Sequence, residues 1–134
     1  MGARPRRAAG EMGQAAAELA LVLPLLALLA LLLLQVGLVV RDQVLVAHAA
    51  REAAREAAVD DDPGAAREAA LAGARLDPAR TTVDVRPLGG DADRRPGGRI
   101  RATVTYRSPT DVPLVGALVG DVELTGGAAM RVEG

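Results

Sequence analysis

The chain of 134 residues contains no cysteine, no tryptophan and no phenylalanine, and its only aromatic side chain is that of Tyr106. Without cysteine the chain forms no disulfide bond, so a domain outside the cytoplasm must be held together by packing or by assembly. Ala, Leu and Val supply nearly all of the apolar side chains, and side chains this small build only a thin core. Roughly ninety residues follow the long apolar run near the amino terminus, which is enough for one small soluble domain.

Lysine is also absent, because all sixteen basic residues are arginine, and seventeen acidic residues bring the formal net charge to -1. This balance argues against the electropositive surface that nucleic-acid binding requires, so no nucleic acid is expected among the partners. The only histidine, His48, is expected on a helix surface, and no nucleophile stands near a base in the pattern. We therefore predict that the chain is not an enzyme and that it uses no metal and no cofactor.

Residues 19–40 form an apolar run of 22 residues without a charged side chain. As an α-helix this run measures about 33 Å, which is enough to cross a bilayer. A secretory signal peptide has a shorter apolar centre followed by a cleavage site of small residues, whereas this run passes straight into Arg41. The run is therefore predicted to be a retained transmembrane helix.

The charges that flank the run predict its orientation. Three arginines and one glutamate precede it: Arg4, Arg6, Arg7 and Glu11. Arg41 and Asp42 cancel each other directly after it. Because basic residues stay on the cytoplasmic side of a membrane helix, the amino terminus should lie inside. Residues 41–134 should lie outside the cytoplasmic membrane.

Glu18 stands directly before the apolar run. Hydrocarbon does not solvate a carboxylate, so a charge at the edge of a membrane helix indicates either a charged partner or a functional role. A positively charged group on another chain is the obvious partner.

The helix is expected to continue beyond the membrane, because residues 42–59 are dominated by Ala, Arg and Glu, which are among the best helix formers. Five small side chains fall on one face at helical spacing: Val46, Ala49, Ala50, Ala53 and Ala57. Such a face suits close packing, and the alternative is a solvated stalk that touches nothing. Three aspartates at 60–62 end the helix, and Asp62 with Pro63 predicts the cap and first turn of a second helix over residues 63–76.

After the second helix the pattern changes to the alternation that is typical of β-strands. Residues 81–86 and 99–107 carry β-branched side chains in alternation and predict two strands. One face of the second strand carries Arg101, Thr103 and Thr105, and the other carries Ile100, Ala102, Val104 and Tyr106. The link at 87–98 is rich in Gly, Asp, Arg and Pro, which predicts a mobile hairpin loop and antiparallel pairing.

A further strand pairing is predicted for residues 122–125 and 128–133, with Gly126 and Gly127 between them in a tight turn or a bulge. Residues 113–120 are apolar and punctuated by glycine, so they form either a loop folded onto the sheet or a short helical turn. The predicted fold class is α+β, with a long amino-terminal transmembrane helix extending into a stalk, a second short helix, and a small antiparallel β-sheet of three to four strands.

This organisation divides the chain into four parts. They are a cytoplasmic leader peptide at 1–13, a transmembrane helix at 14–40, an extracytoplasmic helical region at 41–78 and a small antiparallel β domain at 79–134. The leader is polar and basic and has no apolar periodicity, so no packing is expected to hold it in the fold.

Gly13, Gln14 and Glu18, followed directly by the apolar run, resemble the processing site of type IV pilin-like proteins. The resemblance implies that a prepilin peptidase cuts between Gly13 and Gln14 on the cytoplasmic side. It also implies that Glu18 meets the new amino terminus of a neighbouring subunit during assembly. The physics agrees, since a buried carboxylate is tolerable once it is paired with an ammonium group.

More narrowly, three segments resemble the TadE-like family of minor pseudopilins from tight-adherence pilus systems. They are QAAAELALVLP at 14–24, AAREAAR at 49–55 and AMRVE at 129–133. Family members often carry aromatic residues near the span and sometimes cysteines in the tail, and this chain has neither.

The resemblance implies a structural role in assembling a bacterial pilus or a related secretion machine, in the service of adhesion or secretion. The implied partners are the lipid bilayer, a prepilin peptidase, other pilin-like subunits and the pilus assembly platform. Within the span, Pro24, Gln35 and Gly37 are expected to assist helix packing, since small residues and side-chain hydrogen bonds hold helices together in lipid. The alternative is an uncleaved single-pass anchor whose exported domain binds a protein or envelope partner.

Overall fold

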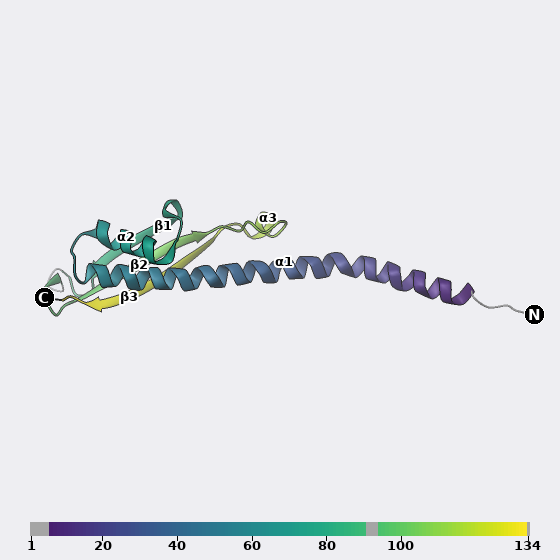
Figure 1. Ribbon diagram of the computed structural model, residues 1–134, viewed down its shortest axis with the longest axis horizontal. Helices are drawn as coiled ribbons and strands as arrows, with labels where there is room; N and C mark the ends of the chain where they lie inside the picture. Colours follow the sequence, from purple (N-terminus) through teal and green to yellow (C-terminus); the bar gives the residue numbers. More distant parts are fainter. Residues whose placement is uncertain (1–5, 91–93, 134) are drawn as a thin grey trace, which may run out of the picture.

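The computed structural model describes residues 6–90 and 94–133, with side chains from Gly13 onward. Arg4 therefore lies outside the described residues, as do the side chains of the other charges that precede Gly13. One very long helix begins far from the rest of the chain and ends inside a small domain, which it forms with a second helix and a three-stranded sheet (Figure 1). This arrangement confirms the predicted α+β fold.

The long helix, α1 (Arg6–Ala57), has 52 residues. It begins at Arg6 rather than at the predicted start, Gln14, so the expected leader and the span share one continuous helix. Residues 6–12 are mostly Arg, Ala, Glu and Met, whose helix propensity outweighs the cost of one glycine. The helix also continues through Pro24, because a membrane helix can absorb a proline as a local adjustment.

The last part of α1 supplies the core of the small domain. The five small side chains on the predicted face are all buried: Val46, Ala49, Ala50, Ala53 and Ala57. They pack against the second helix and against the inner face of the sheet. The predicted packing face is therefore confirmed, and the alternative of a solvated stalk is wrong. The helical region at 41–78 and the β region at 79–134 share this core.

The second helix, α2 (Pro63–Ala74), begins where the sequence predicts. The Asp62 carboxylate accepts a hydrogen bond from the backbone N–H of Gly64 at 2.9 Å, which caps the first turn. The helix ends ahead of residue 76, the predicted end, because Arg75 adopts a left-handed conformation with φ of 52°. The alanines that it buries are Ala66, Ala70 and Ala74. Alanine thus meets alanine between the two helices, which lets them approach closely.

The sheet is a simple antiparallel meander in the order β1, β2, β3. Its strands are β1 (Thr81–Pro87), β2 (Arg99–Ser108) and β3 (Val122–Arg131). A single 3-10 turn, η1 (Pro78–Arg80), leads into β1. The side chains that β2 turns toward the helices include Ile100, Ala102, Val104 and Tyr106, all buried. The predicted alternation is confirmed, although residues 91–93 of the hairpin loop lie outside the described part of the chain.

The predicted break at Gly126 and Gly127 is wrong, because β3 runs through both residues as one strand. A Cβ atom at Gly126 would lie 3.0 Å from the backbone oxygen of Val46 and 3.1 Å from the backbone nitrogen of Ala47. The glycine is therefore needed where β3 crosses directly over α1, and not for a turn. Gly127 faces the other side of the sheet, and a Cβ atom there would meet only ordinary van der Waals contact.

Residues 109–121 connect β2 to β3 and are called the β2–β3 loop below. The loop contains α3 (Gly116–Val119), so both structures predicted for this stretch, a loop and a short helical turn, are present. Val112 and Val115 are buried, whereas Leu118 is 86% exposed. The loop projects past the end of the sheet and runs beside α1 toward its amino-terminal half (Figure 1).

Candidate functional site

The predicted cleavage and assembly residues lie together on α1, far from the small domain. Gly13, Gln14 and Glu18 are all exposed. The Nε2 group of Gln14 donates a hydrogen bond to the Glu18 carboxylate at 3.4 Å, which shows that positions 14 and 18 share one face of the helix. Outside its own turn of the helix, no described residue has an atom within 4 Å of a Cβ atom built at Gly13. The predicted site is thus open to an enzyme or to another subunit.

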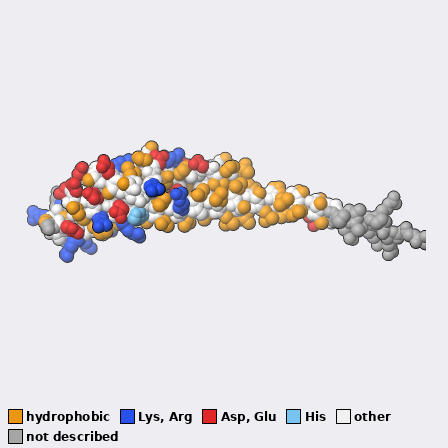
Figure 2. Space-filling model, in the orientation of Figure 1, with side chains coloured by type: hydrophobic (Ala, Val, Ile, Leu, Met, Phe, Trp, Pro, Cys, Tyr) orange, Lys and Arg blue, Asp and Glu red, His pale blue; other side chains and the backbone are white. Residues whose placement is uncertain are grey.

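The apolar run covers α1 with exposed leucine and valine side chains on every side. They include Leu19, Leu21, Val22, Leu23, Leu25, Leu26, Leu28, Leu29, Leu32, Leu33 and Leu34. Figure 2 shows these apolar side chains along the projecting helix, while charged side chains gather over the small domain. A helix that is apolar all round needs lipid or protein around it. Within the described residues, α1 is the one helix long and apolar enough to cross a membrane, which fits a membrane-anchored protein.

The same part of the chain matches a known family, because residues 13–55 fit the family model described as TadE-like protein. This segment is TadE-like. The match confirms the resemblance predicted from the sequence, and it indicates involvement in tight-adherence pilus systems. No match to the chain was found among curated proteins or among solved structures.

The TadE-like segment begins at Gly13 and ends at Arg55. It therefore contains the predicted cleavage bond, Glu18, the whole apolar run and most of the alanine face that packs in the small domain. The apolar run and the domain core are linked by one unbroken helix.

Three residues of the TadE-like segment are predicted to assist packing between helices in the membrane. Pro24 is exposed, and a Cβ atom at Gly37 would meet nothing within 4 Å, so both positions are open to a neighbouring helix. Gln35 differs, because its side chain is only 4% exposed and donates a hydrogen bond from Nε2 to the hydroxyl of Thr110 at 3.4 Å. The helix-packing role of all three residues stays a prediction.

The structure shows a partner of the TadE-like helix that sequence reasoning missed, the β2–β3 loop. Ser108, at the end of β2, donates a hydrogen bond to the Asp42 carboxylate at 2.7 Å. Two turns nearer the amino terminus, Thr110 contacts Gln35. The signal in the sequence is the uncharged stretch of residues 112–120, which resembles core sequence but is too short and too rich in glycine to assign.

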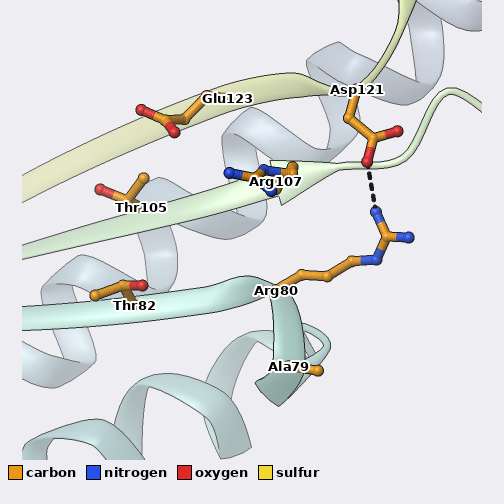
Figure 3. Close-up of a pocket in the computed structure, with 7 residues that line it drawn as sticks. All are labelled: Ala79, Arg80, Thr82, Thr105, Arg107, Asp121 and Glu123. Atoms are coloured by element: carbon orange, nitrogen blue, oxygen red, sulfur yellow. Dashed lines mark hydrogen bonds and ion pairs between the residues drawn. The ribbon is translucent and has the colours of Figure 1, made fainter.

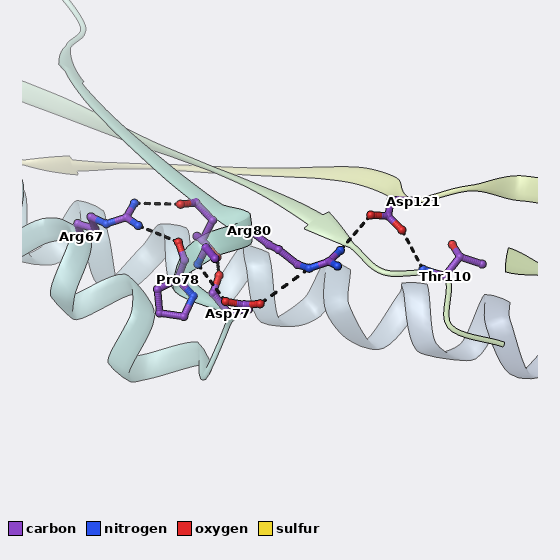
Figure 4. Close-up of polar contacts among 8 residues, drawn as sticks. Arg67, Asp77, Pro78, Arg80, Thr110 and Asp121 are labelled. Atoms are coloured by element: carbon purple, nitrogen blue, oxygen red, sulfur yellow. Dashed lines mark hydrogen bonds and ion pairs between the residues drawn. The ribbon is translucent and has the colours of Figure 1, made fainter.

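A chain of polar contacts holds the base of this loop (Figure 4). Arg67 of α2 donates hydrogen bonds to the carbonyl oxygens of Pro78 and Thr81, both at 2.9 Å. Arg80 pairs with Asp121 at 2.9 Å, and Asp121 accepts a hydrogen bond from the backbone N–H of Thr110 at 3.3 Å. The contacts tie α2, the start of β1 and both ends of the β2–β3 loop together.

An open pocket of about 440 Å³ lies on the outer face of the sheet, beside the base of the loop (Figure 3). It is lined by Ala79, Arg80, Thr82, Thr105, Arg107, Asp121 and Glu123. The pocket mixes both signs of charge with two hydroxyl groups, and its Asp121 is already paired with Arg80. Across the described residues, no group of three or more His, Cys, Asp or Glu side chains is placed to hold a metal ion.

Tyr106 lies at the meeting point of α1, β2 and the loop and is buried. Burial raises the pKa of its phenol above 10.0, and the carboxylates of Asp42 and Asp77 raise this pKa further, against smaller opposing effects of Arg80 and Arg41. The neutral phenol is therefore favoured by the folded state.

The raised pKa of Tyr106 predicts a loss of stability in alkali. Because the folded pKa exceeds the unfolded value, the neutral phenol contributes its full stability below pH ~10, and this contribution is lost as the pH rises through the folded pKa. The chain has no lysine and no cysteine, so no other side chain except arginine titrates in this range. Thermal unfolding followed by circular dichroism should show a falling Tm above pH ~10 for the native chain but not for Tyr106→Phe. An identical alkaline decline in both chains would contradict the assignment.

Proposed function

We propose that this chain is a membrane-anchored minor pseudopilin that takes part in assembling a tight-adherence pilus or a related secretion machine after cleavage by a prepilin peptidase. The observation that carries the proposal is the TadE-like match, which begins at Gly13 and includes Glu18 and the exposed apolar helix. The role is structural and requires neither catalysis nor a cofactor. The partners are the bilayer, the peptidase, other pilin-like subunits and the assembly platform.

The proposed topology places the amino terminus in the bacterial cytoplasm and the small domain outside the cytoplasmic membrane. The excess of arginine before the span supports this orientation, because Arg41 and Asp42 cancel on the other side. The peptidase then meets the Gly13–Gln14 bond on the cytoplasmic side.

Cleavage at this bond requires a local opening of α1, since the helix runs through both residues. Glycine costs about 1 kcal/mol relative to alanine inside a helix, so Gly13 is a weak point where the backbone opens more readily. Gly13 also carries no side chain that would shield the bond, and no described residue outside its own turn of the helix lies within 4 Å of a Cβ atom built there.

After cleavage, the new amino group of Gln14 and the carboxylate of Glu18 lie one helical turn apart. Among the described residues of the single chain, the Glu18 carboxylate accepts a long hydrogen bond of 3.4 Å from the Gln14 amide. In a filament, the ammonium group of a neighbouring subunit provides a stronger, charge-assisted partner. This pairing removes the cost of placing the Glu18 charge at the edge of the hydrocarbon.

Contacts with other pilin-like helices must use the first two thirds of α1. The small face formed by Val46, Ala49, Ala50 and Ala53 is already occupied by α2 and the sheet of the same chain. The apolar surface of residues 19–34 has no such cover. It offers leucine-rich contacts in the membrane, where van der Waals packing contributes to helix association.

The proposal is tested by intact mass and amino-terminal sequencing of the protein extracted from membranes of its native host, beside Gly13→Arg and Gly13→Ala variants. We expect a mature chain that starts at Gln14 in the native protein and complete loss of this product in Gly13→Arg. Space around Gly13 is open, so the arginine blocks the enzyme without changing the fold. Gly13→Ala keeps a small side chain and should retain part of the processing.

A chain that still starts at or near Met1 in all three proteins would overturn the proposed processing. The protein would then be an uncleaved single-pass anchor, and its exported domain would be its functional part. The open, polar pocket beside Arg80 and Arg107 would be the first surface to test for an envelope or protein partner.

A further inference from the structure

The β2–β3 loop carries apolar side chains that the rest of the chain does not cover. Residues 112–120 contain no charged side chain and are bracketed by Asp111 and Asp121. The large apolar side chains exposed on this stretch are Leu114, Leu118 and Val119. Several large apolar side chains exposed together mark a surface that contacts lipid or protein.

The loop lies beside a part of α1 that belongs to the apolar run. Gln35, which contacts Thr110, precedes the end of the run at Val40 by a rise of about 7 Å along the helix. A groove lies between the two segments. Its lining includes apolar residues of the helix and the loop, and also Tyr106 and the charged residues Arg41, Asp42 and Asp111; the apolar residues are Leu34, Leu38, Pro109, Val112 and Pro113. A membrane that surrounds the apolar run of α1 therefore reaches the level of the loop.

We propose that the tip of the β2–β3 loop is embedded in the outer interface of the bilayer that α1 crosses, as a second and shallower membrane contact. The proposal rests on the membrane placement of α1 but not on cleavage or on assembly. In Figure 2 the apolar surface of the projecting helix is continuous with apolar side chains on the adjoining edge of the domain, where Figure 1 places the loop. Lipid is the proposed occupant, because the exposed apolar side chains of the loop lie beside the apolar run of α1.

The backbone of the loop suits the interfacial layer rather than the hydrocarbon centre. The amides of Gly116, Leu118, Val119 and Gly120 donate hydrogen bonds to carbonyl groups within the loop. Pro109 and Pro113 have no amide hydrogen to satisfy. The other amides in the loop need water or lipid headgroups as hydrogen-bond partners. These partners are present only near the membrane surface, so the loop does not reach deep into the lipid.

The charged residues around the loop mark the depth of insertion. Asp121 pairs with Arg80, and Asp42 accepts a hydrogen bond from Ser108. Both contacts lie at the base of the loop, where the headgroup layer solvates charge. Residues 112–120 carry no charged side chain, and Asp111, which lines the groove, lies directly before them, so these charges set a limit to deeper insertion.

The buried Gln35 fits the same arrangement. Its Oε1 atom has no hydrogen-bond partner among the described residues, while its Nε2 atom donates to Thr110. An amide at this depth on a bare helix would face lipid. The loop covers it, so the loop also shields the one polar side chain of the span.

The inference is tested with single tryptophan variants, because the native chain contains no tryptophan and no phenylalanine. Leu118→Trp probes the loop tip, Leu28→Trp probes the span, and Val59→Trp, at a position 70% exposed, probes the far end of the domain. Each variant is reconstituted at about one chain per vesicle into phosphatidylcholine and phosphatidylglycerol. The readout is emission quenching by lipids brominated near the surface or deep in the acyl chain. All three positions are exposed in the structure, so none of the substitutions disturbs the core.

We expect Leu118→Trp to emit at a shorter wavelength than Val59→Trp and to lose most of its emission to shallow bromines. Leu28→Trp should be quenched by deep bromines, and Val59→Trp by neither. Quenching of Leu28→Trp without quenching of Leu118→Trp would overturn the loop contact while leaving the anchor intact. A blue-shifted Leu118→Trp that bromines do not quench would mean that protein covers the loop, which also overturns the proposal. Absence of quenching in Leu28→Trp would overturn the membrane placement itself.

Discussion

A Glu18→Gln variant is expected to be inserted and processed normally but to lose the ability to assemble. The substitution keeps the size of the side chain and removes its charge, so a neighbouring subunit's ammonium group loses its partner in a setting that is poor in water. Breaking a buried ion pair by removing one partner costs about 3–5 kcal/mol, which corresponds to a fall in subunit association on the order of a hundredfold or more. The expected result is therefore a near-complete loss of surface filaments.

The measurement compares filaments sheared from the cell surface, quantified by immunoblot, with the intact mass of the membrane-bound chain. Glu18→Asp is the matched control, because it keeps the charge on a shorter side chain and should retain part of the assembly. Glu18 is exposed, and the buried residues that α1 contributes to the core of the domain begin only at Val46, so the stability of the domain should be unchanged in both variants. Normal filament levels in Glu18→Gln would show that the carboxylate has no role in assembly.

A Gly126→Val variant is expected to destabilise the small domain strongly. The Cβ atom would sit 3.0 Å from the backbone oxygen of Val46, and backbone atoms of a packed helix do not move aside as a flexible side chain does. Overpacking of this kind costs about 1–3 kcal/mol and occasionally more. Valine adds two methyl groups beyond the Cβ atom, so we expect the loss of stability to lie at the upper end of this range. For a domain of this size we expect Tm to fall by about 10 °C or more.

Gly127→Val is the matched control, because Gly127 is the next residue of the same strand and receives the same substitution. Gly127 is exposed, whereas Gly126 is buried. A Cβ atom there would meet only the backbone oxygen of Ala102, at 3.9 Å. Valine also favours extended backbone and restricts the unfolded chain, so the change should be neutral or stabilising by about 0.4–1 kcal/mol. The two variants are compared by thermal unfolding in the same detergent. Equal shifts in Tm for the two variants would show that β3 does not make the close contact with the backbone of α1 at Gly126.

The features predicted correctly are those encoded by residues near one another in the chain. The cap at Asp62, the alternation of β2 and the small face of α1 each follow from local hydrogen bonding or from the spacing of apolar side chains. The TadE-like signature around Gly13 and Glu18 is also local. Such signals are visible in a single sequence because they do not depend on where distant segments lie.

The features that were missed depend on contacts between distant segments. A glycine pair is equally compatible with a turn and with the close crossing of two elements, and only the position of α1 against β3 decided that Gly126 serves the crossing. The start of α1 at Arg6 was missed for another reason. Helix propensity in a short polar segment is too weak to form a helix by itself, but it suffices to extend a helix that the apolar run has already nucleated.

The sequence by itself determined that the chain has one long apolar helix with a carboxylate at its edge, a capped second helix and alternating strands, because these depend on composition and on periodicity. The tertiary structure alone decided that residues 109–121 fold back along α1, cover Gln35 and expose Leu118 beside the apolar run. Gln35 and Thr110 are 75 residues apart in the chain. Their contact arises from the packing of the whole sheet onto the helix, and no local pattern specifies it.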